Sequence, residues 1–194
     1  MSFEETANAK AELRKAIREA RRELTDEQRE AAARQVARRL LELPAFAEGR
    51  GCTVLAYMPM RYELSVVPAV HALRERGFRI AYPLCIEGNG LRLLVPPAEN
   101  GFIVGAYGIM EPREEASREV DASELSAIIL PAIGFDREFN RLGQGGGYYD
   151  RLLAKTSCFT VAVGFDCQLA DRVPTEPTDK KVDAVVTPSF TAVR

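Results

Sequence analysis

The sequence predicts an α/β fold, a single three-layer domain with a mostly parallel central sheet flanked by helices. Short apolar runs with the length of strands alternate along the chain with amphipathic stretches that are long enough for helices. A chain of 194 residues can bury a sizeable core without disulfides. No internal repeat or low-complexity linker divides the sequence, so residues 1–194 are expected to form one domain.

Two helices are expected near the N-terminus. Residues 7–24 carry apolar side chains at helical spacing, with a basic stripe beside them. Thr25 then occupies the position of an N-cap residue, and Gln28, three residues later, completes a capping-box pattern. A second helix should therefore run from about 26 to 42 and end before Pro44.

The rest of the chain alternates between expected strands and helices. A helix is expected from Val66 to Arg76, closed by Gly77, and another from Tyr148 to about Lys155. Apolar runs predict strands at residues 52–57, 78–82, 91–95, 125–131, 159–165 and 184–187. Residues 97–124 are polar and rich in turn-forming residues, and we expect an irregular surface loop there.

Composition excludes several classes of protein. A net charge of −2 provides no global field that would attract nucleic acid. The single histidine, His71, excludes a histidine-rich metal site. The four cysteines form no Cys-x-x-Cys pair and are expected as buried, reduced thiols. Neither a signal peptide nor a membrane-spanning run is recognisable, so we expect a cytoplasmic protein without a membrane partner.

The most informative segment runs from Asn140 to Asp150 and reads Asn-Arg-Leu-Gly-Gln-Gly-Gly-Gly-Tyr-Tyr-Asp. Its glycines disfavour regular structure but allow backbone N–H groups to approach a bulky anion closely. The segment lies between an expected strand and an expected helix, an arrangement that suits phosphate oxygens. Arg141 can make a forked contact to a phosphate, and Asp150 can hold a divalent cation. The alternative is a glycine-rich turn without a ligand, since neither a Walker A loop nor a Rossmann fingerprint is present.

A longer stretch, from Gly134 to Asp150, follows the pattern Gly-Phe-Asp-x-x-x-Asn-Arg-Leu-Gly-x-Gly-x-Gly-Tyr-Tyr-Asp. It resembles the signature of the 5-formyltetrahydrofolate cyclo-ligase family, also called 5,10-methenyltetrahydrofolate synthetase. The segment Lys10-Ala-Glu-Leu-Arg14 is similar to the Lys-x-x-Leu-Arg with which that family opens. One departure is Gly146, where many relatives carry Lys, so this chain would have to supply that charge from elsewhere.

The resemblance implies ATP- and Mg²⁺-dependent cyclisation of 5-formyltetrahydrofolate to 5,10-methenyltetrahydrofolate, with release of ADP and phosphate. Phosphorylation of the formyl oxygen would turn it into a good leaving group, and N10 of the folate would then attack the activated carbon. The protein would mainly position the reactants and stabilise charge. The implied ATP-binding residues are Lys10, Arg14, Arg141, Leu142, Gly143, Gln144, Gly145, Gly146, Gly147, Tyr148 and Tyr149.

Folate and metal contacts are also implied by the resemblance. The implied folate contacts are Met58, Glu63, Tyr148 and Tyr149. A carboxylate such as that of Glu63 can accept two N–H hydrogen bonds from a pterin ring. Asp150 and Asp183 are the implied Mg²⁺ ligands, and Mg²⁺ needs few protein carboxylates beside phosphates and water. From the residues alone, Glu63 could instead be a helix N-terminal acid and Asp183 a cap at the start of a strand.

Some alternatives stay open at this level. Residues Tyr107 to Pro112 resemble a family segment whose role could be packing or substrate contact. The missing Lys at Gly146 leaves room for a paralogue that binds nucleotide or folate without chemistry. A sugar-phosphate isomerase or an acyl-carrier transferase could share a similar α/β sheet. Neither of those enzymes needs a basic helix paired with a glycine-rich loop, so ATP and a folate are the expected partners.

Overall fold

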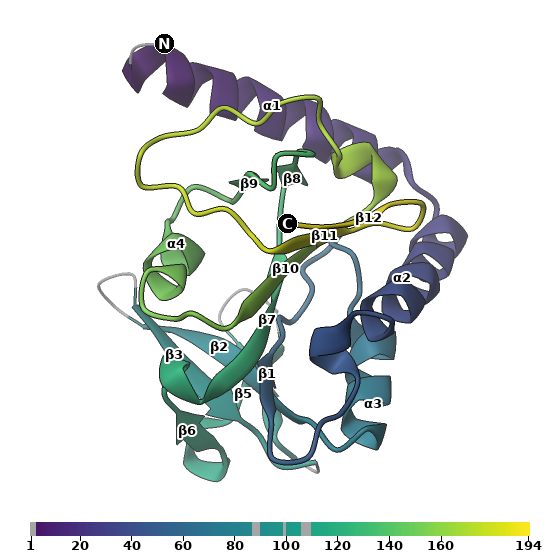
Figure 1. The fold of residues 1–194 in the computed structure, drawn as a ribbon, viewed down its shortest axis with the longest axis vertical. Coiled ribbons are helices and arrows are strands. Elements are labelled where there is room, and N and C mark those ends of the chain that lie inside the picture. The colour runs from purple at the N-terminus through teal and green to yellow at the C-terminus, as the bar shows by residue number, and fades with distance from the viewer. Residues whose placement is uncertain (1–2, 87–89, 99, 106–109) are drawn as a thin grey trace.

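The computed structural model describes residues 3–86, 90–98, 100–105 and 110–194 (Figure 1). Its α-helices are α1 (Phe3–Glu23), α2 (Asp26–Leu41), α3 (Val67–Glu75) and α4 (Tyr148–Leu153). Its strands are β1 (Thr53–Leu55), β2 (Arg79–Ile86), β3 (Gly90–Val95), β4 (Phe102–Val104), β5 (Met110–Pro112), β6 (Arg118–Val120), β7 (Leu125–Pro131), β8 (Gly134–Phe135), β9 (Arg141–Leu142), β10 (Phe159–Val163), β11 (Ala184–Val186) and β12 (Thr191–Val193).

The central sheet has eight strands in the order β12-β11-β10-β7-β1-β2-β3-β6. The five strands from β11 to β2 in this order are parallel to one another. Antiparallel strands close both edges, β12 on one side and β3 with β6 on the other. The predicted α/β fold with a mostly parallel sheet is therefore confirmed.

Each face of the sheet has its own core, and β7 shows how the strands serve both. Ala127 and Ile129 lie in the core that includes side chains of α2 and α3. Ile128 and Leu130 point to the opposite face, where Leu152 of α4 is buried. Side chains alternate across a strand, so a continuous apolar run is what a strand covered on both faces requires. Figure 1 shows α2 and α3 on one side of the sheet and α4 on the other.

Helix α1 does not belong to either of these layers. It lies across the end of the sheet at which β7 leads into the β8–β9 hairpin (Figure 1), and it contacts β8. Acidic residues occupy its first turn and basic residues its last, which matches the helix dipole. The helix is followed at once by the predicted capping box, in which Thr25 and Gln28 exchange side chain to backbone hydrogen bonds of 3.2 and 2.8 Å.

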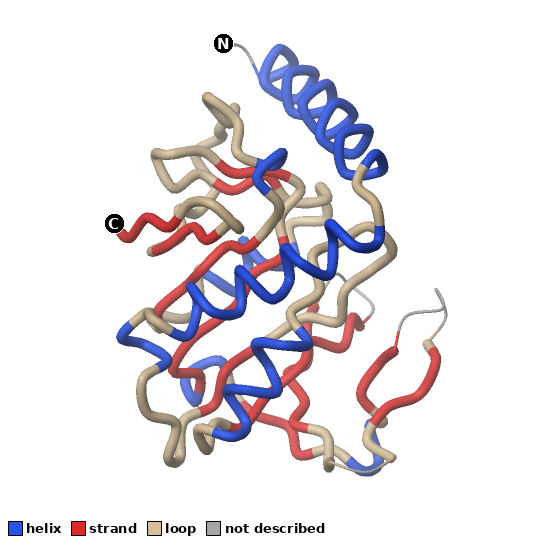
Figure 2. Tube along the Cα trace, turned by 90° about the vertical axis from the view of Figure 1, so that its right-hand side faces the viewer, coloured by secondary structure: helices blue, strands red, loops and turns tan. Residues whose placement is uncertain are grey.

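The prediction of an irregular loop over residues 97–124 is wrong. The described part of this region forms β4 and β5, which pair as a hairpin beside β2, and β6, which extends the sheet next to β3 (Figure 2). Each of these strands has only three residues, so no apolar alternation could reveal it. These strands instead pair with segments that are distant in the sequence, and one contact between them is the ion pair of Arg92 on β3 with Glu119 on β6.

Other differences are smaller. The β8–β9 hairpin and β12 were not predicted, because two or three residues give no readable period. Helix α4 ends at Leu153, earlier than expected. All four cysteines are free, but Cys85 and Cys167 are exposed and Cys52 and Cys158 are only partly buried, so the expectation of buried thiols is wrong. None of the helices formed by described residues combines the length and apolarity needed to cross a bilayer.

The capping box makes a testable contribution to stability. We expect Thr25→Ala to lower the free energy of unfolding by about 1 kcal/mol, because the Gln28 N–H loses its acceptor where α2 begins. Chemical denaturation of both proteins measures the difference. Thr175→Ala, at an exposed threonine outside any helix, is the matched control and should change stability little. Equal stability of Thr25→Ala and wild type would contradict the role of the cap.

Candidate active site

A cavity of about 1140 Å³ gathers segments that are far apart in the sequence. Helix α1, the loop after β1, the glycine-rich loop between β9 and α4, and the chain around residues 176–180 all contribute to its walls. Its lining includes Lys10, Arg14, Met58, Glu63, Arg141, Leu142, Gly143, Gln144, Gly145, Gly146, Gly147, Tyr148, Tyr149, Asp150, Glu176 and Asp179. Of the predicted site residues, Asp183 alone is missing from this lining.

A buried carboxylate fixes the approach to the glycine-rich loop. Asp136 is fully buried and accepts hydrogen bonds from the backbone N–H groups of Glu138 and Asn140, at 2.9 and 3.0 Å, and from the Asn140 side chain. Its second oxygen also accepts from the N–H of Val173, at 2.8 Å. Asp136 therefore closes the turn between β8 and β9 and ties it to a distant part of the chain.

Leu142, the last residue of β9, is part of the same support. Its side chain is buried in a small cluster with Ile17 of α1, Ile133 and Val173. The implied ATP-binding role of Leu142 stays a prediction, and the structure gives its side chain a packing role. That packing holds the hairpin against α1, so the basic helix and the glycine-rich loop face the same cavity.

The glycine-rich loop, Gly143–Gly147, needs two of its glycines for backbone geometry. Gly145 has φ of +108° and Gly147 has φ of +66°, conformations that other residues adopt only with strain. Among the described residues, no acceptor takes a hydrogen bond from the N–H groups of Gly145, Gly146 or Gly147. Free N–H groups along a cavity wall are suited to an anion.

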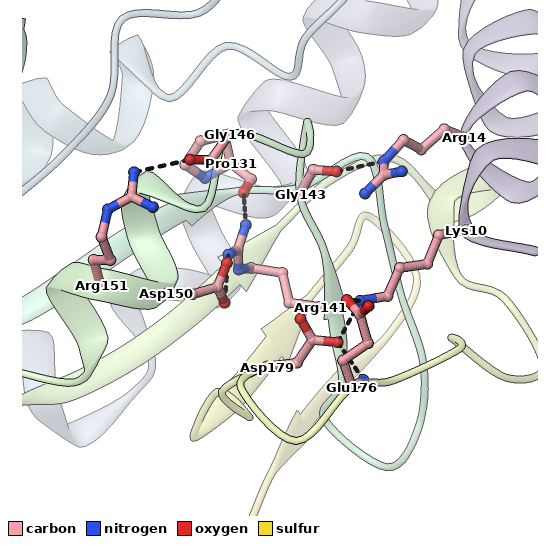
Figure 3. A network of polar contacts seen from close by, with 10 residues as sticks. All are labelled: Lys10, Arg14, Pro131, Arg141, Gly143, Gly146, Asp150, Arg151, Glu176 and Asp179. Atoms are coloured by element: carbon pink, nitrogen blue, oxygen red, sulfur yellow. Dashed lines mark hydrogen bonds and ion pairs between the residues drawn. The ribbon is translucent and has the colours of Figure 1, made fainter. Parts of the chain in front are cut away.

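Helix α1 braces this loop with two arginines. Arg14 Nε donates to the carbonyl of Gly143 at 2.9 Å (Figure 3), and Arg18 Nη2 donates to the Gln144 side chain at 2.7 Å. Burial, together with the nearby charge of Arg18, lowers the pKa of Arg14 from its usual value, but the guanidinium remains charged at neutral pH. Arg14 thus provides a fixed positive charge at the rim of the loop.

Lys10 is almost fully buried and is held by two carboxylates (Figure 3). Its Nζ lies 2.5 Å from Glu176 Oε2 and 2.6 Å from Asp179 Oδ2. Burial works against the charged form, but the hydrogen bonds to Asp179 and Glu176 outweigh it and raise the pKa of Lys10. Sequence reasoning missed Glu176 and gave Asp179 no role, because the partners are more than 160 residues away from Lys10 in the chain.

Arg141 and Asp150 form the second ion pair of the cavity. Arg141 Nη2 lies 3.2 and 3.3 Å from the two carboxylate oxygens of Asp150, and Nη1 donates to the carbonyl of Pro131 (Figure 3). The Arg141 side chain is 3% exposed, whereas that of Asp150 is 27% exposed and lines the cavity. Arg141 is therefore fixed in place, and Asp150 keeps an accessible side toward the cavity.

Tyr149 covers the same ion pair. Its ring centre lies 5.7 Å from the Arg141 guanidinium carbon. Burial raises the pKa of Tyr149, so its hydroxyl stays a neutral hydrogen-bond donor at physiological pH. Tyr148 is half-buried, and the Arg151 guanidinium lies over its ring.

The segment after β1 contributes the predicted folate contacts. Glu63 accepts a hydrogen bond from the N–H of Met60 at 3.0 Å, and Gln144 of the glycine-rich loop reaches its other oxygen at 3.4 Å. Helix α3 begins at Val67, and Glu63 does not cap it. The structure thus brings Glu63 and Met58 to the cavity and does not realise the alternative of a helix N-terminal acid, while the folate contact stays a prediction.

Asp183 lies elsewhere, and the structure does not assemble the predicted pair with Asp150. Asp183 Oδ2 accepts hydrogen bonds from the N–H and hydroxyl of Thr160 at 2.9 and 2.7 Å, and Oδ1 accepts from Arg194. Asp183 therefore links the start of β10 to the start of β11, as expected for a residue that caps the start of a strand. The described residues contain no group of three or more acidic, His or Cys side chains placed to hold a metal. Asp150, with its accessible oxygens, is the carboxylate that suits a metal shared with phosphates and water.

Part of the segment at Tyr107 to Pro112 can also be placed. Tyr107, Gly108 and Ile109 lie outside the described residues. Met110 and Glu111 belong to β5, and both line the cavity. Contact of these two residues with a substrate stays a prediction.

Comparison with known proteins identifies the family of the chain. Residues 6–188 match the model of the 5-formyltetrahydrofolate cyclo-ligase family. The 5-formyltetrahydrofolate cyclo-ligase of Escherichia coli K12 is 34% identical, over 89% of this chain and 97% of its own. The 5-formyltetrahydrofolate cyclo-ligase of Mycolicibacterium smegmatis is 32% identical, over 93% of this chain and 94% of its own. The solution structure of 5,10-methenyltetrahydrofolate synthetase from Aquifex aeolicus superposes with a TM-score of 0.82 at 33% identity, covering 95% of this chain and 92% of that one. The family model matches nearly the whole chain, and relatives that are about one-third identical carry the same name. This protein is therefore an enzyme that belongs to the 5-formyltetrahydrofolate cyclo-ligase family.

Proposed function

We propose that this enzyme uses ATP and Mg²⁺ to convert 5-formyltetrahydrofolate to 5,10-methenyltetrahydrofolate, ADP and phosphate. The observation that carries the proposal is the meeting, in one cavity, of the basic face of α1, the glycine-rich loop and Asp150. Lys10 and Arg14 supply positive charge, and the loop supplies N–H groups without an internal acceptor. Such groups suit a triphosphate, while Glu63 and Tyr149 offer an acceptor and an aromatic surface to a pterin.

The chemistry needs positioning more than a protein nucleophile. The formyl oxygen attacks the γ-phosphorus of ATP, and ADP leaves. N10 then attacks the formyl carbon, its proton is lost, and the C–O bond breaks with release of phosphate. Charges placed in advance around the phosphates lower the barrier of the first step. Asp150 is the residue that would hold Mg²⁺, which when bound would neutralise phosphate charge.

A direct assay tests the proposal. Purified protein is incubated with Mg-ATP and 5-formyltetrahydrofolate while the absorbance of the methenyl product and the release of ADP are followed. We expect the two products in equal amounts, and neither when ATP or Mg²⁺ is omitted. ATP binding without methenyl product would instead support a paralogue that binds nucleotide but does no chemistry. The expected cytoplasmic location and the absence of a nucleic-acid partner stay predictions from the sequence.

The metal assignment is tested with Asp150→Asn. The amide still accepts a hydrogen bond from Arg141 but binds Mg²⁺ poorly, so the Mg²⁺ concentration for half-maximal activity should rise about tenfold or more. Folate binding without ATP should change little. Asp183→Asn is the matched control, because Asp183 is absent from the cavity lining, and it should lower thermal stability without changing the Mg²⁺ requirement. The reverse result would assign the metal to Asp183.

The buried lysine is tested with Lys10→Ala. Its removal takes away a positive charge and leaves Glu176 and Asp179 facing the phosphates, so the KM for ATP should rise at least about tenfold. Lys15→Ala, at an exposed position of the same helix, should leave that KM unchanged. Steady-state kinetics at saturating folate measure both variants. A normal KM in Lys10→Ala would restrict Lys10 to a structural role.

The glycine-rich loop is tested by a pair of substitutions. Gly145→Ala places a Cβ at φ of +108°, which strains the backbone by about 1–3 kcal/mol and should displace the loop. We expect weaker ATP binding in calorimetry and only a small drop in Tm. Gly146→Lys restores the residue of many relatives. Its Cβ would lie 2.8 Å from the Tyr148 ring, which has to turn aside, and ATP affinity should be kept or increased. Normal ATP binding by Gly145→Ala would show that the loop is only a turn.

A further inference from the structure

The turn from Glu176 to Asp179 presents two carboxylates to the main cavity. The N–H of Asp179 donates to the carbonyl of Glu176 at 3.0 Å, and Pro177 suits the second position of such a β-turn. Asp179 Oδ2 also accepts from the N–H of Glu176 at 2.7 Å, which holds the two acidic residues close together. All four residues of the turn line the cavity. We call Glu176 and Asp179 the carboxylate pair.

The chain on either side of this turn is anchored to the β8–β9 hairpin. Val173, before the turn, donates its N–H to Asp136 at 2.8 Å, and Val182, after it, donates its N–H to the carbonyl of Phe139 at 3.0 Å. The side chains of both valines are buried. The segment that carries the carboxylate pair is therefore fixed at both of its ends, and the pair has a defined place in the wall of the cavity.

The carboxylate pair does more than neutralise Lys10. Lys10 Nζ lies 2.5 Å from Glu176 Oε2 and 2.6 Å from Asp179 Oδ2 (Figure 3). One ammonium group against two carboxylates leaves this group of three side chains with a net charge of −1. A single carboxylate is enough to orient a lysine, so the second one adds negative charge to a wall that, in the proposed function, receives phosphates.

The charge of the carboxylate pair also acts on the next turn of α1. Burial lowers the pKa of Arg14, the charge of Arg18 lowers it further, and the charges of Asp179 and Glu176 oppose this shift. Arg14 itself donates to the carbonyl of Gly143, and no carboxylate of the described residues lies within ion-pair distance of it. Of these two cations on α1, therefore, only the lysine has to exchange carboxylates for phosphate oxygens.

The exchange at Lys10 bears on how products leave the cavity. The Lys10 side chain is only 8% exposed, so without the carboxylate pair the departure of ADP would leave a buried ammonium group unpaired, which is costly. Glu176 and Asp179 remove this cost, because they take the ammonium group back as the phosphates leave. The same carboxylates repel the phosphates while these are bound. Both effects weaken the binding of a nucleotide.

We infer that Glu176 and Asp179 are positioning residues that compete with phosphate for Lys10, lower the affinity for ADP and thereby speed its release after each turnover. This inference rests on the proposed function, in which ADP is a product. It gives the carboxylate pair an effect opposite to that of a phosphate-binding residue, since removal of its charge should strengthen the binding of nucleotide. Loss of a purely structural contact would do the reverse, because it would loosen the wall of the cavity.

The test measures ADP binding, in the presence of Mg²⁺, to the wild type, Glu176→Gln and Asp179→Asn. Each variant removes one negative charge and keeps the size of the side chain. We expect the Kd of ADP in calorimetry to fall about tenfold in each variant. The dissociation rate of fluorescently labelled ADP, followed by stopped flow, should fall by a similar factor. Asp171→Asn, at an exposed carboxylate outside the cavity lining, is the matched control and should behave like the wild type.

The outcomes separate this inference from the proposed function. If the wild type forms methenyl product but the Kd of ADP in Glu176→Gln is unchanged or higher, the role of the carboxylate pair is overturned and the proposed function stands. If the wild type forms no methenyl product, both are overturned. Melting curves confirm that the compared proteins are folded. Glu176→Gln keeps the backbone hydrogen bonds of the turn and the side chain of Asp179, so it decides the matter even if Asp179→Asn is unstable.

Discussion

The buried carboxylate of Asp136 is the interaction on which the site depends. It accepts hydrogen bonds from the turn between β8 and β9 and from the N–H of Val173. The first set positions Arg141 and the glycine-rich loop that follows it. The second fixes the chain shortly before Glu176 and Asp179, which hold Lys10. A single carboxylate without exposure to water thus orders both walls of the cavity, and its hydrogen bonds offset the cost of burying it.

The cavity holds its charges in pairs. Lys10 faces two carboxylates and Arg141 faces one, so the site is ordered without relying on a bound phosphate. A triphosphate entering here competes with these carboxylates for the two cations. A metal bound at Asp150 would compete with Arg141 in the same way. Arg14 differs, because its hydrogen bond goes to a backbone carbonyl and its charge stays available.

The main cavity and the recess that adjoins it differ in how their positive charges are balanced. In the main cavity, Lys10 and Arg141 have carboxylate partners, which suits a site where phosphates and a metal exchange. An adjoining recess is lined by Arg18, Arg21, Arg22 and Arg61. Within the described residues no carboxylate forms an ion pair with any of these four, and Arg21 keeps a buried donor without an acceptor. The loop from Met58 to Glu63 separates the two environments and lines both.

The sequence by itself determined the parallel strands, the helices and the glycine-rich loop. Strands covered on both faces appear as apolar runs, the capping box marks the start of α2, and two loop glycines adopt positive φ. Tertiary structure alone decided which charges meet. Lys10 finds its partners more than 160 residues away, and Arg21 finds the carbonyl of Tyr62. It also placed Asp183 at a strand start, outside the lining of the cavity that includes Asp150. The local pattern of apolar and polar residues shows which segments are buried and where the chain turns. Contacts between residues far apart in the sequence depend on how the layers pack, and the spacing of residues along the chain does not record that packing.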